Sequence, residues 1–74
     1  MGSKYPVLKD TEIVRRLKKL GYTFKSQKGS HAKYVKITGT HKNTVIVPMN
    51  KDTPRGTLQS ILEQANLSLE QFMQ

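Results

Sequence analysis

The sequence has 74 residues, enough for a single domain with one small hydrophobic core. It contains no cysteine, which excludes disulfides, thiolate nucleophiles and cysteine metal ligands, and fits a cytoplasmic protein. No apolar stretch approaches the roughly 20 residues of a membrane helix, and no signal-peptide pattern opens the chain. The net charge of +8 favours a polyanionic partner.

The positive charge is concentrated in one part of the chain. From Ile13 to Lys51 there is no acidic residue. That segment holds ten basic residues, namely Arg15, Arg16, Lys18, Lys19, Lys25, Lys28, Lys33, Lys36, Lys42 and Lys51. Ordinary solubilising charge explains a few lysines but explains such a run less well. A membrane surface is the less favoured polyanion, because no amphipathic helix carries bulky aromatic residues; we therefore expect a nucleic-acid phosphate backbone.

The N-terminal part predicts an arm followed by a helix. Residues 1–9 are expected to form a loose arm, with Pro6 disfavouring helix just before it. A helix of about three turns follows, because apolar residues recur at helical spacing. Its apolar stripe comprises Ile13, Val14, Leu17 and Leu20. Asp10 or Thr11 can cap its start, and Gly21 suits a left-handed C-terminal cap.

Three strand-like runs come next, over residues 22–27, 31–38 and 44–47. Lys28-Gly29-Ser30 predicts a turn between the first two, and residues 39–43 break the second run from the third. Pro48 ends the third run because proline cannot donate to a strand ladder. Short connections between consecutive strands predict an antiparallel meander.

The C-terminal part predicts a polar loop over residues 49–55 and a second helix. The apolar stripe of this helix comprises Leu58, Ile61, Leu62 and Ala65. Thr57 or a neighbour can cap its start, Asn66 can close it, and residues 68–71 resemble a capping box that opens a last short turn. The fold class is therefore α+β, in the order α-β-β-β-α. A three-stranded antiparallel sheet with two helices on one face leaves the other face, or the rim, for a ligand.

The first candidate site is His31, which follows the turn Lys28-Gly29-Ser30. Gly29 can adopt a positive φ and places His31 at the start of the second strand, near the sheet edge. RNA cleavage without a metal requires a proton acceptor for the ribose 2′-OH and stabilisation of charge on the phosphate. A histidine among lysines could supply both. As a bare pattern, Gly-Ser-His fits a plain surface histidine in a turn better.

Strand alternation sorts the neighbours of His31. Lys33 shares its face and could contact the same phosphate, whereas Tyr34 points to the other face and is expected in the core. His41 is expected to be a solvated loop residue rather than a second catalyst. Two histidines without cysteine and with few carboxylates make a poor zinc set, so we expect no metal site.

The second candidate site is the run Thr53-Pro54-Arg55-Gly56-Thr57. Free N–H groups at a helix start, a hydroxyl cap and an arginine together favour an anion. Gly56 would let a phosphate approach the backbone closely. A plain helix start is an equally good interpretation. The chain has no P-loop, no dinucleotide-binding glycine motif and no Ser-His-Asp set with suitable spacing.

Four segments occur in an order and spacing that together are fairly specific: residues 17–22 (LKKLGY), 27–34 (QKGSHAKY), 45–48 (VIVP) and 55–65 (RGTLQSILEQA). With these segments, residues 11–67 resemble the HicA family of mRNA interferase toxins, also called YcfA-like proteins. The resemblance implies a fold similar to double-stranded-RNA-binding domains. It also implies an endoribonuclease that cleaves mRNA without a metal or cofactor, and direct neutralisation by a HicB-type antitoxin.

The histidine of the family's Gly-Ser-His motif falls on His31, which the resemblance makes the catalyst. The expected RNA-binding residues are Lys28, Gly29, Ser30, Lys33, Arg55, Gly56 and Thr57. One departure is visible: many family members carry a histidine after Val-Pro, where this chain has Met49-Asn50. If that histidine assists catalysis in relatives, this chain lacks the corresponding catalytic residue.

Two other functions are compatible with the sequence. A non-catalytic module that binds double-stranded RNA needs basic residues and a helix terminus but no catalyst. A protein-interaction domain could use the basic face for an acidic partner only. RNA that stays intact after long incubation would favour the first, and failure to bind RNA at low salt would favour the second.

Overall fold

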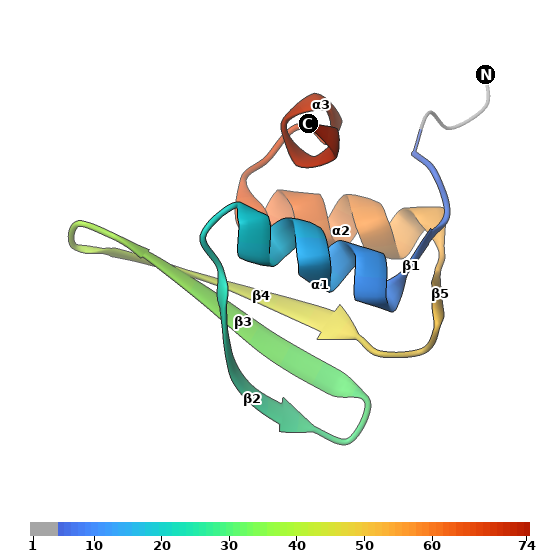
Figure 1. The fold of residues 1–74 in the computed structure, drawn as a ribbon, viewed down its shortest axis with the longest axis horizontal. Helices are drawn as coiled ribbons and strands as arrows, with labels where there is room; N and C mark the ends of the chain where they lie inside the picture. Colours follow the sequence, from blue (N-terminus) through green and yellow to red (C-terminus); the bar gives the residue numbers. More distant parts are fainter. Residues whose placement is uncertain (1–4) are drawn as a thin grey trace.

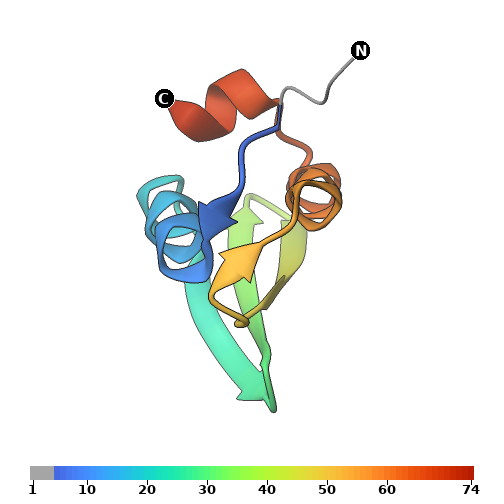
Figure 2. The same cartoon turned by 90° about the vertical axis from the view of Figure 1, so that its right-hand side faces the viewer.

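The computed structural model describes residues 5–74. Its elements run in the order β1 (Leu8–Lys9), α1 (Asp10–Lys19), β2 (Thr23–Lys28), β3 (His31–Thr38), β4 (His41–Pro48), β5 (Asp52–Thr53), α2 (Arg55–Ala65) and α3 (Leu69–Met73). Helices α1 and α2 cover one face of the sheet formed by β2, β3 and β4, and α3 lies beyond them (Figures 1 and 2). The predicted α-β-β-β-α fold is confirmed.

The main sheet is antiparallel in the order β2-β3-β4, so β3 is the central strand. Both hairpins close through two-residue turns, in which Gly29 and Gly39 stand first with φ of 59° and 60°. Glycine at that position suits the turns that match the twist of paired strands. The β2 ladder is interrupted by a bulge between Phe24 and Ser26, which leaves Lys25 without a partner on β3.

The core forms between the helices and one face of the sheet. The predicted apolar stripes supply Ile13 and Leu17 from α1, and Leu58, Ile61, Leu62 and Ala65 from α2, all of them buried. The sheet contributes Ala32 and Tyr34 from β3 and Val45 and Val47 from β4. Because side chains alternate along a strand, His31 and Lys33 point to the face that the helices leave uncovered.

The C-terminal ends of α1 and α2 and the start of α3 follow the capping chemistry expected from their residues. Gly21 has a φ of 101° and donates to the Lys18 carbonyl, while the Tyr22 N–H donates to the Leu17 carbonyl, which together form a Schellman motif. Asn66 ends α2 in the left-handed conformation, and Ser68 opens α3 with a complete capping box. None of the helices described within residues 5–74 is long and apolar enough to span a membrane.

The predicted arm over residues 1–9 is wrong at its last two residues, and residues 1–4 lie outside the described part of the chain. Leu8 and Lys9 form β1, which pairs antiparallel with β5 so that Leu8 opposes Thr53 and Lys9 opposes Asp52. The loop predicted over residues 49–55 therefore contains a short strand. Partners so distant in sequence leave no local pattern, which is why periodicity did not reveal this pairing.

Other local predictions are also corrected. His41 is the first residue of β4, opposite Thr38, rather than a loop residue, because the second hairpin needs only two turn residues. Neither α1 nor α2 begins with a side-chain cap: the N-cap positions are Lys9 and Pro54. Thr57 lies within the first turn of α2 instead of capping it.

We expect Leu17→Ala to lower the free energy of unfolding by about 2–5 kcal/mol, because Leu17 is fully buried between α1 and the sheet. The matched control is Ile37→Ala, which removes an apolar side chain that is 71% exposed and should change stability by about 0.5 kcal/mol or less. Urea denaturation followed by circular dichroism measures both. Equal losses in the two variants would contradict the described packing of α1.

Candidate active site

His31 is the first residue of the central strand, immediately after the Gly29-Ser30 turn. It opposes Lys28 on β2 and Pro48 on β4, and its side chain is exposed. The predicted position at the start of the strand is thus correct, although β3 is the central strand and His31 lies at the end of the sheet, not along its side. An exposed imidazole at this place is accessible to a large substrate.

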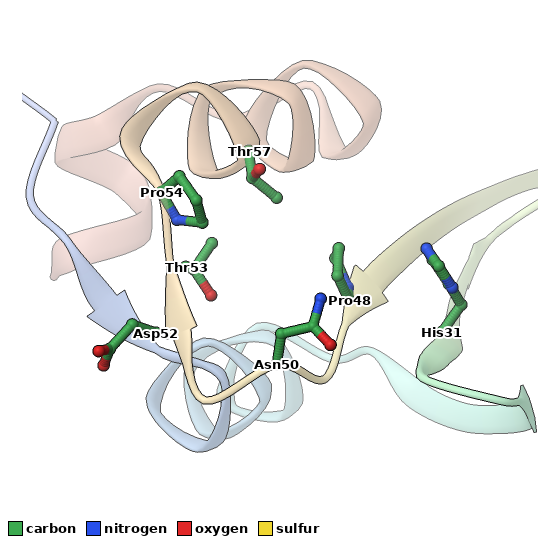
Figure 3. Close-up of a pocket in the computed structure, with 7 residues that line it drawn as sticks. All are labelled: His31, Pro48, Asn50, Asp52, Thr53, Pro54 and Thr57. Carbon is green, nitrogen blue, oxygen red and sulfur yellow. The ribbon is translucent and has the colours of Figure 1, made fainter.

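A cavity of about 310 Å³ separates His31 from the start of α2 (Figure 3). It is lined by His31, Pro48, Asn50, Asp52, Thr53, Pro54 and Thr57. Figure 3 shows the imidazole on one side of the cavity and Thr57 and Pro54 on the other, with Asn50 between them. The two candidate sites of the sequence are therefore brought together by the fold.

The segment between β4 and α2, residues 49–54, forms the floor of the cavity and is held at two points. The Met49 N–H donates to the Ser30 carbonyl at 2.5 Å, which ties the segment to the turn before His31. At the second point, Asp10 holds the backbone of Lys51 through two hydrogen bonds. The Asp10 N–H donates to the Lys51 carbonyl at 2.6 Å, and the Asp10 carboxylate accepts from the Lys51 N–H at 3.0 Å. Lys51 has a φ of 69°, so the two bonds hold a turn that its residue type does not favour.

The first turn of α2 presents backbone N–H groups without a competing acceptor from its own side chains. Pro54, the N-cap residue, makes no side-chain cap, and the first turn contains no acidic residue. Such a helix start carries partial positive charge and favours a phosphate. A Cβ atom added at Gly56 would meet no atom within 4 Å, so the backbone there is open to close approach.

The predicted site residues separate into two groups. His31 and Thr57 line the cavity, with Lys28, Gly29 and Ser30 in the adjoining strand end and turn. Arg55 and Gly56 belong to the first turn of α2 but do not line the cavity, and the Arg55 Nε donates to the Tyr5 carbonyl at 2.8 Å. Lys33 lies two residues beyond His31 on the same face of β3, also outside the cavity.

Sequence reasoning missed Pro48, Asn50 and Asp52 as part of the cavity lining, whereas Thr53 and Pro54 belong to the second candidate site; the loop between β4 and α2 gave no signal of its direction. The one available hint was Asn50, which belongs to the Met49-Asn50 pair where relatives carry a histidine. Asp52 is the acid of this cavity, but its carboxylate lies 3.4 Å from the Lys9 ammonium and points away from His31 (Figure 3). Within residues 5–74, no three His, Asp or Glu side chains are grouped to hold a metal ion.

Comparison with protein families gives one match, over residues 11–67, to the HicA toxin of bacterial toxin–antitoxin systems. The match covers well over half of the chain. The chain belongs to the HicA toxin family. Comparison with curated proteins found no matching relative. The HicA match includes every residue that lines the cavity, and it leaves β1 and α3 outside.

Membership of the HicA family makes this chain a toxin and implies an antitoxin as its partner. Beyond the family, the geometry adds an exposed imidazole, a cavity and an uncapped helix start at one end of the molecule. That combination can accept a phosphate at the helix start while a proton is exchanged at the imidazole.

We expect Asp10→Ala to lower the free energy of unfolding by about 1–2 kcal/mol, because it removes the carboxylate that binds Lys51 and stabilises the start of α1. It should also shift the amide NMR signals of Asn50 and Thr53. The control Asp52→Ala removes only the exposed ion pair with Lys9 and should cost about 0.5 kcal/mol or less. If Asp10→Ala left both stability and these signals unchanged, Asp10 would not hold the cavity floor.

Proposed function

We propose that this HicA-family toxin is an endoribonuclease that cleaves mRNA without a metal ion, with His31 as its catalytic residue. The observation that carries the proposal is the exposed His31 imidazole facing the uncapped first turn of α2 across a cavity. A phosphate at the helix start would place the adjacent ribose on the His31 side. The resemblance of residues 27–34 to the family's Gly-Ser-His segment supports the same assignment.

In the proposed reaction, His31 accepts the proton of the ribose 2′-OH. The 2′-oxygen then forms a bond to the neighbouring phosphorus, and the bond from phosphorus to the 5′-oxygen of the next nucleotide breaks. The leaving 5′-oxygen takes up a proton, either from the imidazolium formed in the first step or from water. Charge on the phosphate would be stabilised by the backbone N–H groups of Gly56 and Thr57, with Lys28 and Lys33 nearby.

The proposal includes a HicB-type antitoxin as the partner and the cytoplasm as the location. A protein that covers both His31 and the cavity would prevent RNA from reaching the imidazole, which is exposed and lines the cavity. The bond from the Arg55 Nε to the Tyr5 carbonyl uses one of the five N–H donors of the guanidinium, so the other donors would still be able to bind a phosphate.

The test is cleavage of RNA in the presence of a metal chelator. Wild type should cleave, and His31→Ala should lower the rate by about 10²–10⁴-fold, the usual contribution of a general acid or base. The control is His41→Ala, which removes the other histidine at the opposite end of the β3–β4 hairpin and should cleave like wild type. Expression of wild type, but not of His31→Ala, should arrest growth.

Two outcomes would reject the proposal. Equal cleavage by His31→Ala and wild type would remove His31 from the reaction. Intact RNA with both proteins, together with binding that weakens steeply as salt rises, would instead identify a non-catalytic RNA-binding module.

A further inference from the structure

We propose that the uncovered face of the main sheet is a second RNA-contacting surface, on which Lys25, Lys33 and Lys42 bind the phosphate backbone of the strand that enters the His31 cavity. The inference rests on the proposed ribonuclease function. We call this surface the open face. It consists of the side chains of β2, β3 and β4 that point away from α1 and α2.

Strand register defines the residues of the open face. Ala32 and Tyr34 point to the helices, so the alternate residues of β3 point away from them. The open face therefore carries His31, Lys33, Val35 and Ile37 from β3, their partners Lys28, Ser26 and Thr23 from β2, and Pro48, Ile46, Thr44 and Lys42 from β4. His31 thus stands where the open face meets the cavity.

Lys25 joins this surface through the bulge in β2. It has no partner on β3, and its ammonium lies beside that of Lys42, two strands away. Direct contact with Lys25 and its repulsion lower the pKa of Lys42, with burial and the charge of Lys33 adding to the effect. Three lysines from three strands therefore converge on one part of the open face.

No acidic side chain of the described chain compensates these lysines. Within residues 5–74 the ion pairs are Lys9–Asp52, Arg15–Glu12 and Arg16–Glu12, and none involves a residue of the main sheet. The segment from Ile13 to Lys51 contains no Asp or Glu at all. An anion placed between Lys25 and Lys42 would attract both ammonium groups and offset their mutual repulsion, so this part of the open face favours an anionic ligand.

The chemistry of the open face fits a sugar-phosphate backbone. Besides lysines it presents the hydroxyl groups of Ser26 and Thr44, which can donate to phosphate oxygens, whereas the Thr23 hydroxyl donates to the Val35 carbonyl. Apart from the His31 imidazole at its end, it has no aromatic ring on which a base could stack, because Tyr34 is buried on the helix side and Phe24 is its partner there. Contacts of this kind would position RNA without reading its sequence.

The open face is continuous with the proposed catalytic position. His31 and Lys33 are two residues apart on one side of β3, a separation of about 7 Å along the strand. Lys25 and Lys42 lie farther along the same face, toward the Gly39 turn. An RNA strand that follows these residues would reach the His31 imidazole from the sheet and pass on toward the first turn of α2.

The experiment measures binding of a fluorescein-labelled single-stranded RNA to the uncleaving His31→Ala protein over a range of salt concentrations. Adding Lys25→Gln and Lys42→Gln removes two charges from the open face. If each lysine neutralises one phosphate, the two substitutions should reduce the steepness of the plot of log association constant against log salt by about 1.4. They should also weaken binding about twentyfold at 0.1 M salt. The matched control combines Lys18→Gln and Lys19→Gln, which remove the same charge from exposed positions on α1 and should leave the salt dependence of binding unchanged. Thermal melting checks that the two double variants stay folded.

Each result decides between explanations. Equal loss of binding in the two double variants would mean that total charge alone matters, and unchanged binding in the open-face variant would exclude the surface; either result overturns this inference while leaving cleavage by wild type intact. A wild-type protein that neither cleaves nor binds RNA would overturn the proposed function as well. Binding of polyglutamate that depends on Lys25 and Lys42, without binding of RNA, would assign the open face to an acidic protein and reject the RNA proposal.

Discussion

The placement of the cavity depends on how the segment between β4 and α2 is held. Met49 is bonded to the turn before His31, and Lys51 is bonded to Asp10 at the start of α1. These bonds, with the pairing of β1 and β5, direct the chain across the end of the sheet before α2 begins. The first turn of α2 therefore faces His31 at the far side of a cavity, although 23 positions separate Pro54 from His31 in sequence.

One-sided burial explains the rest of the molecule. Both long helices pack on the same face of a three-stranded sheet, and all but one of the buried apolar residues of that sheet point toward them. The exception is Val35, near the middle of the other face. That face also carries the apolar side chains of Ile37, Ile46 and Pro48 among its lysines and hydroxyl groups, and neither α1 nor α2 covers it. Fold stability and ligand contact are thus assigned to opposite sides of the same strands, and residues such as Tyr34 and Lys33 can differ in role while adjacent in sequence.

Much of this structure could be predicted from the sequence, because it depends on local patterns. Helical spacing identified Leu17 and Leu58 as core residues, strand alternation separated Tyr34 from Lys33, and Gly29 marked the turn before His31. The N-caps of α1 and α2 and the place of His41 were local features predicted wrongly, and the other failures were features that require distant partners. The strand at Leu8–Lys9 exists only through its pairing with Asp52–Thr53, and the role of Asp10 depends on Lys51. The cavity lining was missed for the same reason, since a loop's direction is set by such tethers and not by its composition.

The bulge in β2 also bears on how copies of this protein meet one another. β2 is an edge strand, and an uninterrupted edge would offer its free N–H and C=O groups to the same edge of a second copy. Here the ladder is broken between Phe24 and Ser26, so only short stretches could pair. Lys25 and Lys28 would also bring like charges together across any such contact. The irregularity that turns Lys25 toward Lys42 thus also makes β2 a poor edge for pairing with a second copy.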